Sequence, residues 1–184
     1  MASKQIGHNE IDMLHGPLFM KILLFALPLA ASSVLQQLFN SVDVAVVGRF
    51  ASSEALAAVG SNAPVINLLI NLFVGISMGA NAVISNHIGQ NDREKIRSAV
   101  STSAVVALLS GVFLMVLGTA VAGPVHRMMG TPVEVTRMAV SYLRIYFLGM
   151  PFIMIFNFGS AILRSLGDTR RPLYILIWAG IINT

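Results

Sequence analysis

Four long runs without a charged residue constrain the fold of this chain more than any other feature of its sequence. They cover residues 22–42, 55–86, 98–125 and 145–163, and each reaches the roughly 20 residues that a helix needs to cross a bilayer. The whole chain is 55% hydrophobic and 11% charged, against about 25% charged in ordinary soluble domains. A single run of this kind could be a buried helix of a soluble protein. Four of them predict an all-α integral membrane protein, a polytopic helical bundle.

The boundaries between the runs predict where the helices begin and end. Residues 1–16 are expected to form an N-terminal leader, and membrane helices are expected at about 18–48, 55–86, 95–122 and 136–165, with an incomplete one at 172–184. Asn91 with Glu94 and Thr131 with Glu134 have the three-residue spacing of a helix N-cap and its reciprocal acid. The last run has only thirteen residues, which is too short to cross a bilayer. We therefore expect the chain to be a fragment of a longer protein.

The distribution of basic residues predicts the orientation in the membrane. Eight of the twelve Lys and Arg residues fall in the leader and in the second and fourth loops, and four fall on the opposite side. The positive-inside rule then places the N-terminus in the cytoplasm of a multi-pass protein of the bacterial plasma (inner) membrane. Basic residues at helix ends, rather than along a stripe, do not suggest nucleic acid binding. The lipid bilayer is the expected partner surface.

Asp43 is the candidate functional residue, because a carboxylate inside an apolar segment costs several kcal/mol and usually has a partner or a role. Helical spacing places Ser33, Gln36 and Asn40 on the same face as Asp43. One interpretation is an ion-coupling site, in which Asp43 alternates between a protonated form and a carboxylate that holds Na⁺. The other is a residue at the membrane surface. The polar companions deeper in the helix favour the ion-coupling site.

Other polar or conformationally restricted positions allow two interpretations each. Pro28 either bends the first helix during a transport cycle or forms a static kink. Asn67 and Asn71 share a face of the second helix and either line a cavity or bond to neighbouring helices. Asn157 shares a face with methionines, which suit either an adaptable ligand cavity or ordinary packing. No nucleophile–base pair, Walker loop or HExxH motif occurs, so we expect no enzyme activity.

Several segments, in their order along the chain, resemble the bacterial branch of the multidrug and toxic compound extrusion (MATE) family. They are GPLFMKILLFALPLAASSVLQQLFNSVDVAVVGRF, EALAAVGSNAP, GQNDREKIR and ILRSLGDTRRP. The resemblance implies helices 1–4 and the start of helix 5 of a transporter with twelve helices in two lobes. Such a transporter exports cationic or amphipathic small molecules in exchange for Na⁺ or H⁺, and needs no other cofactor. Residues 17–184 would form part of its N-terminal lobe, and the remaining helices would be partners of this chain.

The resemblance also implies roles for individual residues. Asp43 would be the cation or proton site of the N-terminal lobe, and Pro28 the bend that responds to its protonation. Asn183 matches an asparagine that the family follows, four residues later, with a second acidic residue. Phe39 stands where many members carry tyrosine. The residues expected to line the cavity are Gln36, Phe39, Asn40, Asn67, Asn71 and Asn157.

Two alternatives remain open at the level of sequence. The first is a flippase of lipid-linked precursors from the same superfamily, which would carry basic residues inside its cavity. The second is a truncated membrane protein that does not transport and only packs against a partner.

Overall fold

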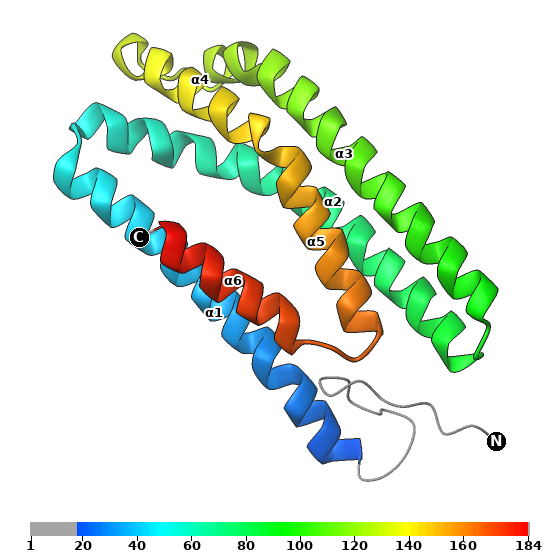
Figure 1. Cartoon of the computed structure of the whole chain (residues 1–184). Helices are drawn as coiled ribbons and strands as arrows, with labels where there is room; N and C mark the ends of the chain where they lie inside the picture. Colours follow the sequence, from blue (N-terminus) through cyan, green and yellow to red (C-terminus); the bar gives the residue numbers. More distant parts are fainter. Residues whose placement is uncertain (1–17, 184) are drawn as a thin grey trace.

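Residues 18–183 are described by a computed structural model and form six helices (Figure 1). They are α1 (Leu18–Phe50), α2 (Ser53–Gly89), α3 (Arg93–Met128), α4 (Val133–Leu148), α5 (Met150–Ser165) and α6 (Arg170–Asn183). No strand occurs within this range, which confirms the all-α fold expected from the apolar runs. Helices α1, α2 and α3 are each long and apolar enough to cross a membrane, and α4 with α5 makes a fourth span if the two are counted together.

The region expected to be a single helix over 136–165 is divided into two. Helices α4 and α5 meet at Gly149 and are bent by 48° relative to each other. Pro151 is the second residue of α5. It has no N–H to donate to the carbonyl one turn earlier, and its ring would clash there in a straight helix. The prediction of one continuous helix is therefore wrong at this position, and the proline explains the break.

Helix α3 packs along both halves of the broken span through a face of small residues. A side chain at Gly111 would meet the Cα atom of Pro151 at 2.5 Å, and one at Gly118 would meet the ring of Phe147 at 2.1 Å. Small residues allow this close approach, which is how helices associate where lipid supplies no hydrophobic driving force. The buried face of α3 consists of Ser103, Ala107, Ser110, Gly111, Leu114, Gly118, Ala122 and His126.

The apolar core lies around this break. Leu114 of α3, Leu143 and Phe147 of α4, and Met150 and Met154 of α5 are all fully buried. They form one cluster with Ile66 of α2 and Ala122 of α3. Helices α2 to α5 therefore form a packed unit, and the break lies inside its core rather than at a free hinge.

The two ends of the bundle are defined by its turns. At the α1–α2 end, α1 meets α2 and α3 meets α4; at the α2–α3 end, α2 meets α3 and α5 meets α6 (Figure 1). Asp43 lies seven residues before the last residue of α1 and is therefore nearer to the α1–α2 end.

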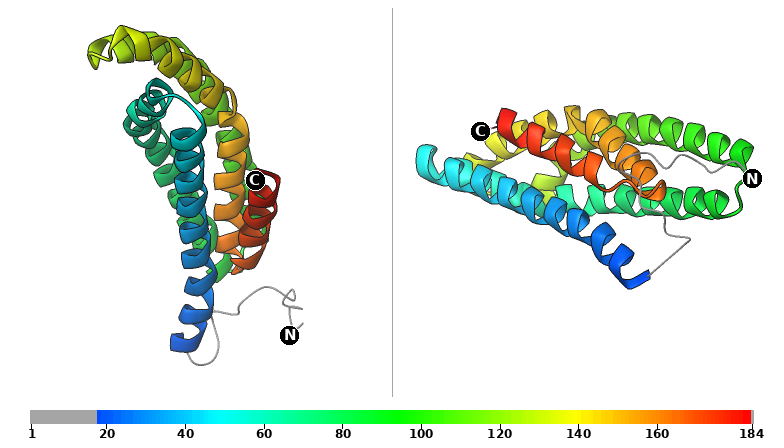
Figure 2. Two further views of the ribbon diagram at one scale, coloured as in Figure 1. Left: turned by 90° about the vertical axis from the view of Figure 1, so that its left-hand side faces the viewer. Right: turned by 60° about the horizontal axis from the view of Figure 1, so that its bottom comes forward.

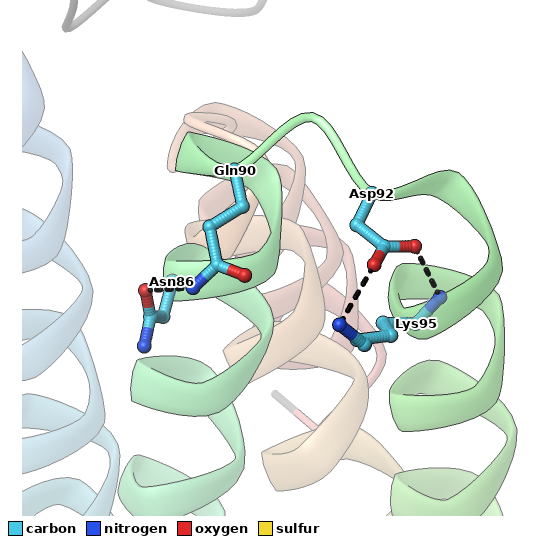
Figure 3. A network of polar contacts seen from close by, with 4 residues as sticks. All are labelled: Asn86, Gln90, Asp92 and Lys95. Atoms are coloured by element: carbon cyan, nitrogen blue, oxygen red, sulfur yellow. Dashed lines mark hydrogen bonds and ion pairs between the residues drawn. The ribbon is translucent and has the colours of Figure 1, made fainter.

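The turn between α2 and α3 shows why one of the expected helix caps is displaced by a residue. Asn91 has a φ of 55°, in the left-handed region, and Asp92 is the N-cap (Figure 3). Asp92 Oδ1 accepts a hydrogen bond from Lys95 N at 3.1 Å, and Asp92 Oδ2 pairs with Lys95 Nζ at 3.0 Å. On the other side of the turn, Gln90 Nε2 donates to Asn86 Oδ1 at 3.0 Å. The prediction of Asn91 as the cap is thus wrong because the turn uses this residue to reverse the chain.

The second expected cap is also absent. Pro132, not Thr131, stands at the N-cap position of α4, and no side chain caps this helix. The Thr131 hydroxyl instead lies 3.1 Å from Nδ1 of His126 on α3.

Helices α1 and α6 stand beside the packed unit and run in the same direction (Figures 1 and 2). Of the described helices, α1 packs only against α6 and α2, whereas α6 packs against α1 and α5. Most of the surface of α1 is thus left uncovered by the described part of the chain.

Candidate ion-coupling site

Asp43 lies on the exposed surface of α1, together with the polar side chains that precede it on the same face. Gln36 and Asn40 are exposed, one and two turns before Asp43. Ser33 is exposed as well, and its hydroxyl donates to the carbonyl of Leu29 at 3.1 Å within α1. An uncovered polar stripe on a helix of this length cannot face lipid without a large cost. This face of α1 therefore requires protein or water beside it.

Pro28 lies inside α1, fifteen residues before Asp43, and α1 continues through it. Its ring leaves the carbonyl of Leu24 without the usual intrahelical donor. The Ser32 hydroxyl donates to the carbonyl of Pro28 at 2.8 Å. A serine bonded back to the helix in this way weakens the local ladder further and often accompanies a bend. The segment around Pro28 is therefore a weak point of α1.

Helix α6 is aligned with α1 by one close contact. A side chain at Gly180 would meet the Cζ atom of Phe39 at 1.8 Å, so the Phe39 ring lies directly on the backbone of α6. Asp43 follows Phe39 by four residues and Asn183 follows Gly180 by three, and the two helices run in parallel (Figure 1). A rise of about 1.5 Å per residue brings Asp43 and Asn183 to similar heights, about 6 and 4.5 Å beyond the contact. The backbone register therefore places these two predicted site residues at one level.

Tyr142 of α4 is a residue near Asp43 that the sequence did not indicate. The Asp43 carboxylate interacts electrostatically with the Tyr142 hydroxyl. The Tyr142 ring stacks on that of Tyr146 with their centroids 6.3 Å apart. Tyr142 is ninety-nine positions from Asp43 in the sequence, and no local pattern links them. A tyrosine on an otherwise apolar stretch was the available signal, since a buried phenol usually has a polar neighbour.

The remaining predicted site residues lie elsewhere. Asn67 and Asn71 are exposed on α2, on a different face from the buried Asn62 and Ile66. Asn157 is half-buried on α5, and its Nδ2 donates to the carbonyl of Ile153 in the same helix at 3.0 Å. In residues 18–183, no contact is recorded that joins these three asparagines to Asp43.

The chemistry available for a cation at Asp43 is that of oxygen ligands. Within the described range, no group of three or more His, Cys, Asp or Glu side chains is arranged to hold a metal ion. A hard cation such as Na⁺ held by Asp43 would thus take its other ligands from amide, hydroxyl, main-chain or water oxygens, as hard cations do. A proton would need only the carboxylate.

Comparison with known proteins identifies relatives over most of the chain. The family described as MatE matches residues 28–184. The probable multidrug resistance protein YoeA of Bacillus subtilis is 36% identical over 160 residues, which is 87% of this chain and 35% of that protein. These matches confirm the family that the sequence motifs suggested.

Two solved structures share the fold. The outward-facing conformation of a multidrug resistance MATE family transporter has a TM-score of 0.84 at 26% identity, covering 94% of this chain and 38% of the other. A MOP superfamily transporter from Pyrococcus furiosus has a TM-score of 0.88 at 27% identity, covering 98% of this chain and 39% of the other. Its structure is described as having a binding pocket of reverse polarity that suggests a different function. The chain thus spans little more than a third of the length of the relatives it matches.

Proposed function

Because this chain belongs to the MatE family, we propose that it forms part of a secondary active antiporter. This antiporter exports cationic or amphipathic compounds in exchange for Na⁺ or H⁺. Residues 17–184 supply part of the N-terminal lobe, and the remaining helices of the transporter complete it. The protein lies in the bacterial plasma membrane with its N-terminus in the cytoplasm. The similarity to YoeA, named as a probable multidrug resistance protein, supports the substrate class.

The position of Asp43 carries the proposal. Asp43 lies on an uncovered polar face of α1, and Phe39, one turn before it, contacts α6 directly. Tyr142 is close enough to Asp43 to interact with it electrostatically. A carboxylate in such a place holds a cation or a proton, and it loses most of its interaction with its surroundings when it is neutralised. Asp43 with Asn183 forms the coupling site, and Gln36, Asn40, Asn67, Asn71 and Asn157 line the path of the substrate.

The weak point at Pro28 gives the site a means to change shape. Neutralising Asp43 changes which partners α1 prefers at its α1–α2 end, and α1 packs against only two described helices. Bending at Pro28 disturbs few hydrogen bonds, since one is already missing there. Binding of the coupling ion can thus be converted into movement of α1 relative to α6 and the packed unit of α2 to α5.

Transport in proteoliposomes tests the proposal. The full open reading frame that encodes this chain is reconstituted with ethidium, a cationic amphipathic dye, inside the vesicles, and efflux is driven by a Na⁺ or an H⁺ gradient alone. Asp43→Asn should abolish efflux under the gradient that drives the wild type, because the amide cannot take up either ion. Glu134→Gln, which neutralises an exposed acid at the start of α4, should leave efflux unchanged. Undiminished gradient-driven efflux by Asp43→Asn would show that the assigned role is wrong.

A flippase of lipid-linked precursors is the second candidate, favoured by the similarity to the Pyrococcus furiosus transporter of reverse pocket polarity. Such a function requires basic side chains facing the anionic substrate. Arg144 follows Tyr142 by two residues, roughly 200° around α4, and so points away from the side on which Tyr142 meets Asp43. The antiporter remains the better-supported candidate. Competition by an anionic lipid pyrophosphate, but not by organic cations, would favour the flippase.

A third candidate is a membrane protein that does not transport. Expression of residues 1–184 alone distinguishes it from the antiporter: transport by the full open reading frame but not by these residues indicates that the missing helices are required. Absence of transport by both favours the third candidate.

A further inference from the structure

Two polar side chains are completely buried where α2, α3 and α4 meet at the α1–α2 end. Asn62 of α2 and His126 of α3 both have an exposed fraction of 0%. Asn62 Oδ1 lies 2.9 Å from His126 Nε2, although the two residues are sixty-four positions apart. Burying such groups is costly unless each is hydrogen-bonded. Their retention inside a bundle otherwise held by apolar and small residues calls for a reason.

The hydrogen bonds of Asn62 assign a role to each atom of the pair. Asn62 Nδ2 donates to the carbonyl of Ala58, one turn earlier in α2, at 2.8 Å, and to the carbonyl of Ala139 in α4 at 3.0 Å. Both amide hydrogens are thus used, so Oδ1 is the acceptor and His126 Nε2 must donate to it. His126 Nδ1 can then accept from the Thr131 hydroxyl, 3.1 Å away. The network is complete with a neutral histidine protonated at Nε2.

This network fixes α4 relative to α2 and α3. Asn62 bonds to the main chain of α4, and His126 holds the Asn62 amide in the orientation that this bond requires. Around it, Ala58, Val135 and Ala139 form a small buried apolar cluster. Thr131, at the turn before α4, is bonded to His126 both through its hydroxyl and through its N–H, which donates to the His126 carbonyl at 3.2 Å. We call Asn62, His126 and Thr131 the α4 brace.

The brace lies one helical turn from the candidate coupling site. Ala139, whose carbonyl Asn62 binds, precedes Tyr142 by three residues in α4, and a helix is rigid over such a distance. In the described part of the chain, α1 packs against α2 and α6 but not against α4. The position of Tyr142 relative to Asp43 is therefore set indirectly, through α2 and its bond to α4.

We propose that Asn62 and His126 are positioning residues for ion coupling: they hold α4 so that the Tyr142 hydroxyl faces Asp43. The proposal rests on the function proposed above, and it names the residues that adjust the affinity of that site. Loss of the brace lets α4 shift at Ala139 and moves Tyr142 away from the carboxylate. The affinity of Asp43 for its coupling ion then changes without any substitution at the site itself.

The chain provides a matched control. Asn81, also on α2, donates its Nδ2 to the carbonyl of Ala161 at 2.8 Å. This bond has the same chemistry as that of Asn62 and a similar length, but it holds α5, on the other side of the break at Gly149. If the brace only stabilises the bundle, removing either asparagine amide should have the same effect on transport.

The first measurement is the concentration of the coupling ion at half-maximal transport, determined with the full open reading frame in proteoliposomes. Asn62→Ala and His126→Leu should each shift it by about fivefold, the factor expected for loss of roughly one hydrogen bond. Asn81→Ala should leave it unchanged, even if the maximal rate falls. In a double variant with Tyr142→Phe, Asn62→Ala should add nothing to the shift that Tyr142→Phe causes alone. Equal values for Asn62→Ala and Asn81→Ala, or additive shifts in the double variant, would overturn the proposal.

A second measurement does not depend on transport. With 3-fluorotyrosine incorporated, the ¹⁹F resonance of Tyr142, assigned by its loss in Tyr142→Phe, should move on substitution of Asp43→Asn. This response should vanish in the Asn62→Ala and His126→Leu backgrounds and persist in the Asn81→Ala background. If the wild-type protein shows no ion-driven transport, the proposed function fails, yet this spectrum still decides whether the brace positions Tyr142. A response that persists without Asn62 would contradict the brace in either case.

Discussion

Replacing Gly118 by alanine should destabilise the bundle at the contact between α3 and α4. A Cβ atom at this position would lie 2.1 Å from Cγ and 2.2 and 2.4 Å from the two Cδ atoms of the Phe147 ring. Ordinary van der Waals contact begins near 3.4 Å, so the ring would have to retreat by roughly 1.3 Å. Cγ is bonded to Cβ of Phe147 and lies on the axis of ring rotation. Turning the ring therefore cannot relieve the clash, and α4 itself must move.

The expected magnitude follows from two opposing terms. Overpacking a filled core typically costs about 1–3 kcal/mol, and Phe147 has an exposed fraction of 0%. Exchange of glycine for alanine inside a helix stabilises by about 0.5–1 kcal/mol. The net destabilisation should be about 1–2 kcal/mol, or roughly 2–8 °C in the midpoint of thermal unfolding.

Thermal unfolding in detergent, followed by far-ultraviolet circular dichroism, measures the effect. Gly123→Ala is the matched control, because Gly123 lies on the same helix and a side chain there would meet nothing within 4 Å. Its unfolding midpoint should be equal to that of the wild type or slightly higher. Combining Gly118→Ala with Phe147→Leu should cost less than the sum of the two single changes, since the smaller side chain makes room. The packing argument is refuted if Gly118→Ala is as stable as Gly123→Ala.

Two further changes affect the turns at the α2–α3 end. Hydrogen bonds from the N–H and side chain of Lys95 lower the pKa of Asp92, so its stabilising effect is complete above the ordinary value of about 3.9 and is lost as the pH falls through the lowered value. Hydrogen exchange in the first turn of α3 should accelerate at such acid pH in the wild type, and Asp92→Ala should show this fast exchange already at pH 7; slow exchange in Asp92→Ala would argue against the cap. Asp168 is 2% exposed and its Oδ1 accepts from the N–H groups of Arg170 and Arg171 at 3.1 Å each. Asp168→Ala should therefore lower the free energy of unfolding by about 1–3 kcal/mol, and Asp168→Asn, which keeps an acceptor, by less; equal losses in the two variants would show that these bonds contribute little.

Some features of the candidate site could be predicted because they depend on residues close together in the sequence. The stripe of Gln36, Asn40 and Asp43 follows from helical periodicity alone, and the structure leaves these residues uncovered on α1. The weak point at Pro28 follows from the chemistry of proline. The roles of Asp43, Asn183 and Pro28 in ion coupling remain predictions, to be decided by the transport experiments.

Local patterns misled where one residue had two possible partners. Thr131 has the spacing of a helix cap, yet its hydroxyl bonds to His126, a residue that the sequence marked only as lying at a helix end. The continuous apolar character of 136–165 concealed the break at Gly149, since hydropathy does not register the hydrogen bond that Pro151 removes.

By itself, the sequence determined that the chain is an all-helical membrane protein of the MatE family. Apolar runs of bilayer length must satisfy their own backbone hydrogen bonds, and the helix is the local way to do so. Only the tertiary structure decided that Asn62 meets His126, that Phe39 lies on Gly180, and that Tyr142 faces Asp43. These pairs lie between sixty-four and one hundred and forty-one positions apart. They depend on the register in which separate helices pack, which a repeat of 3.6 residues along one helix does not specify.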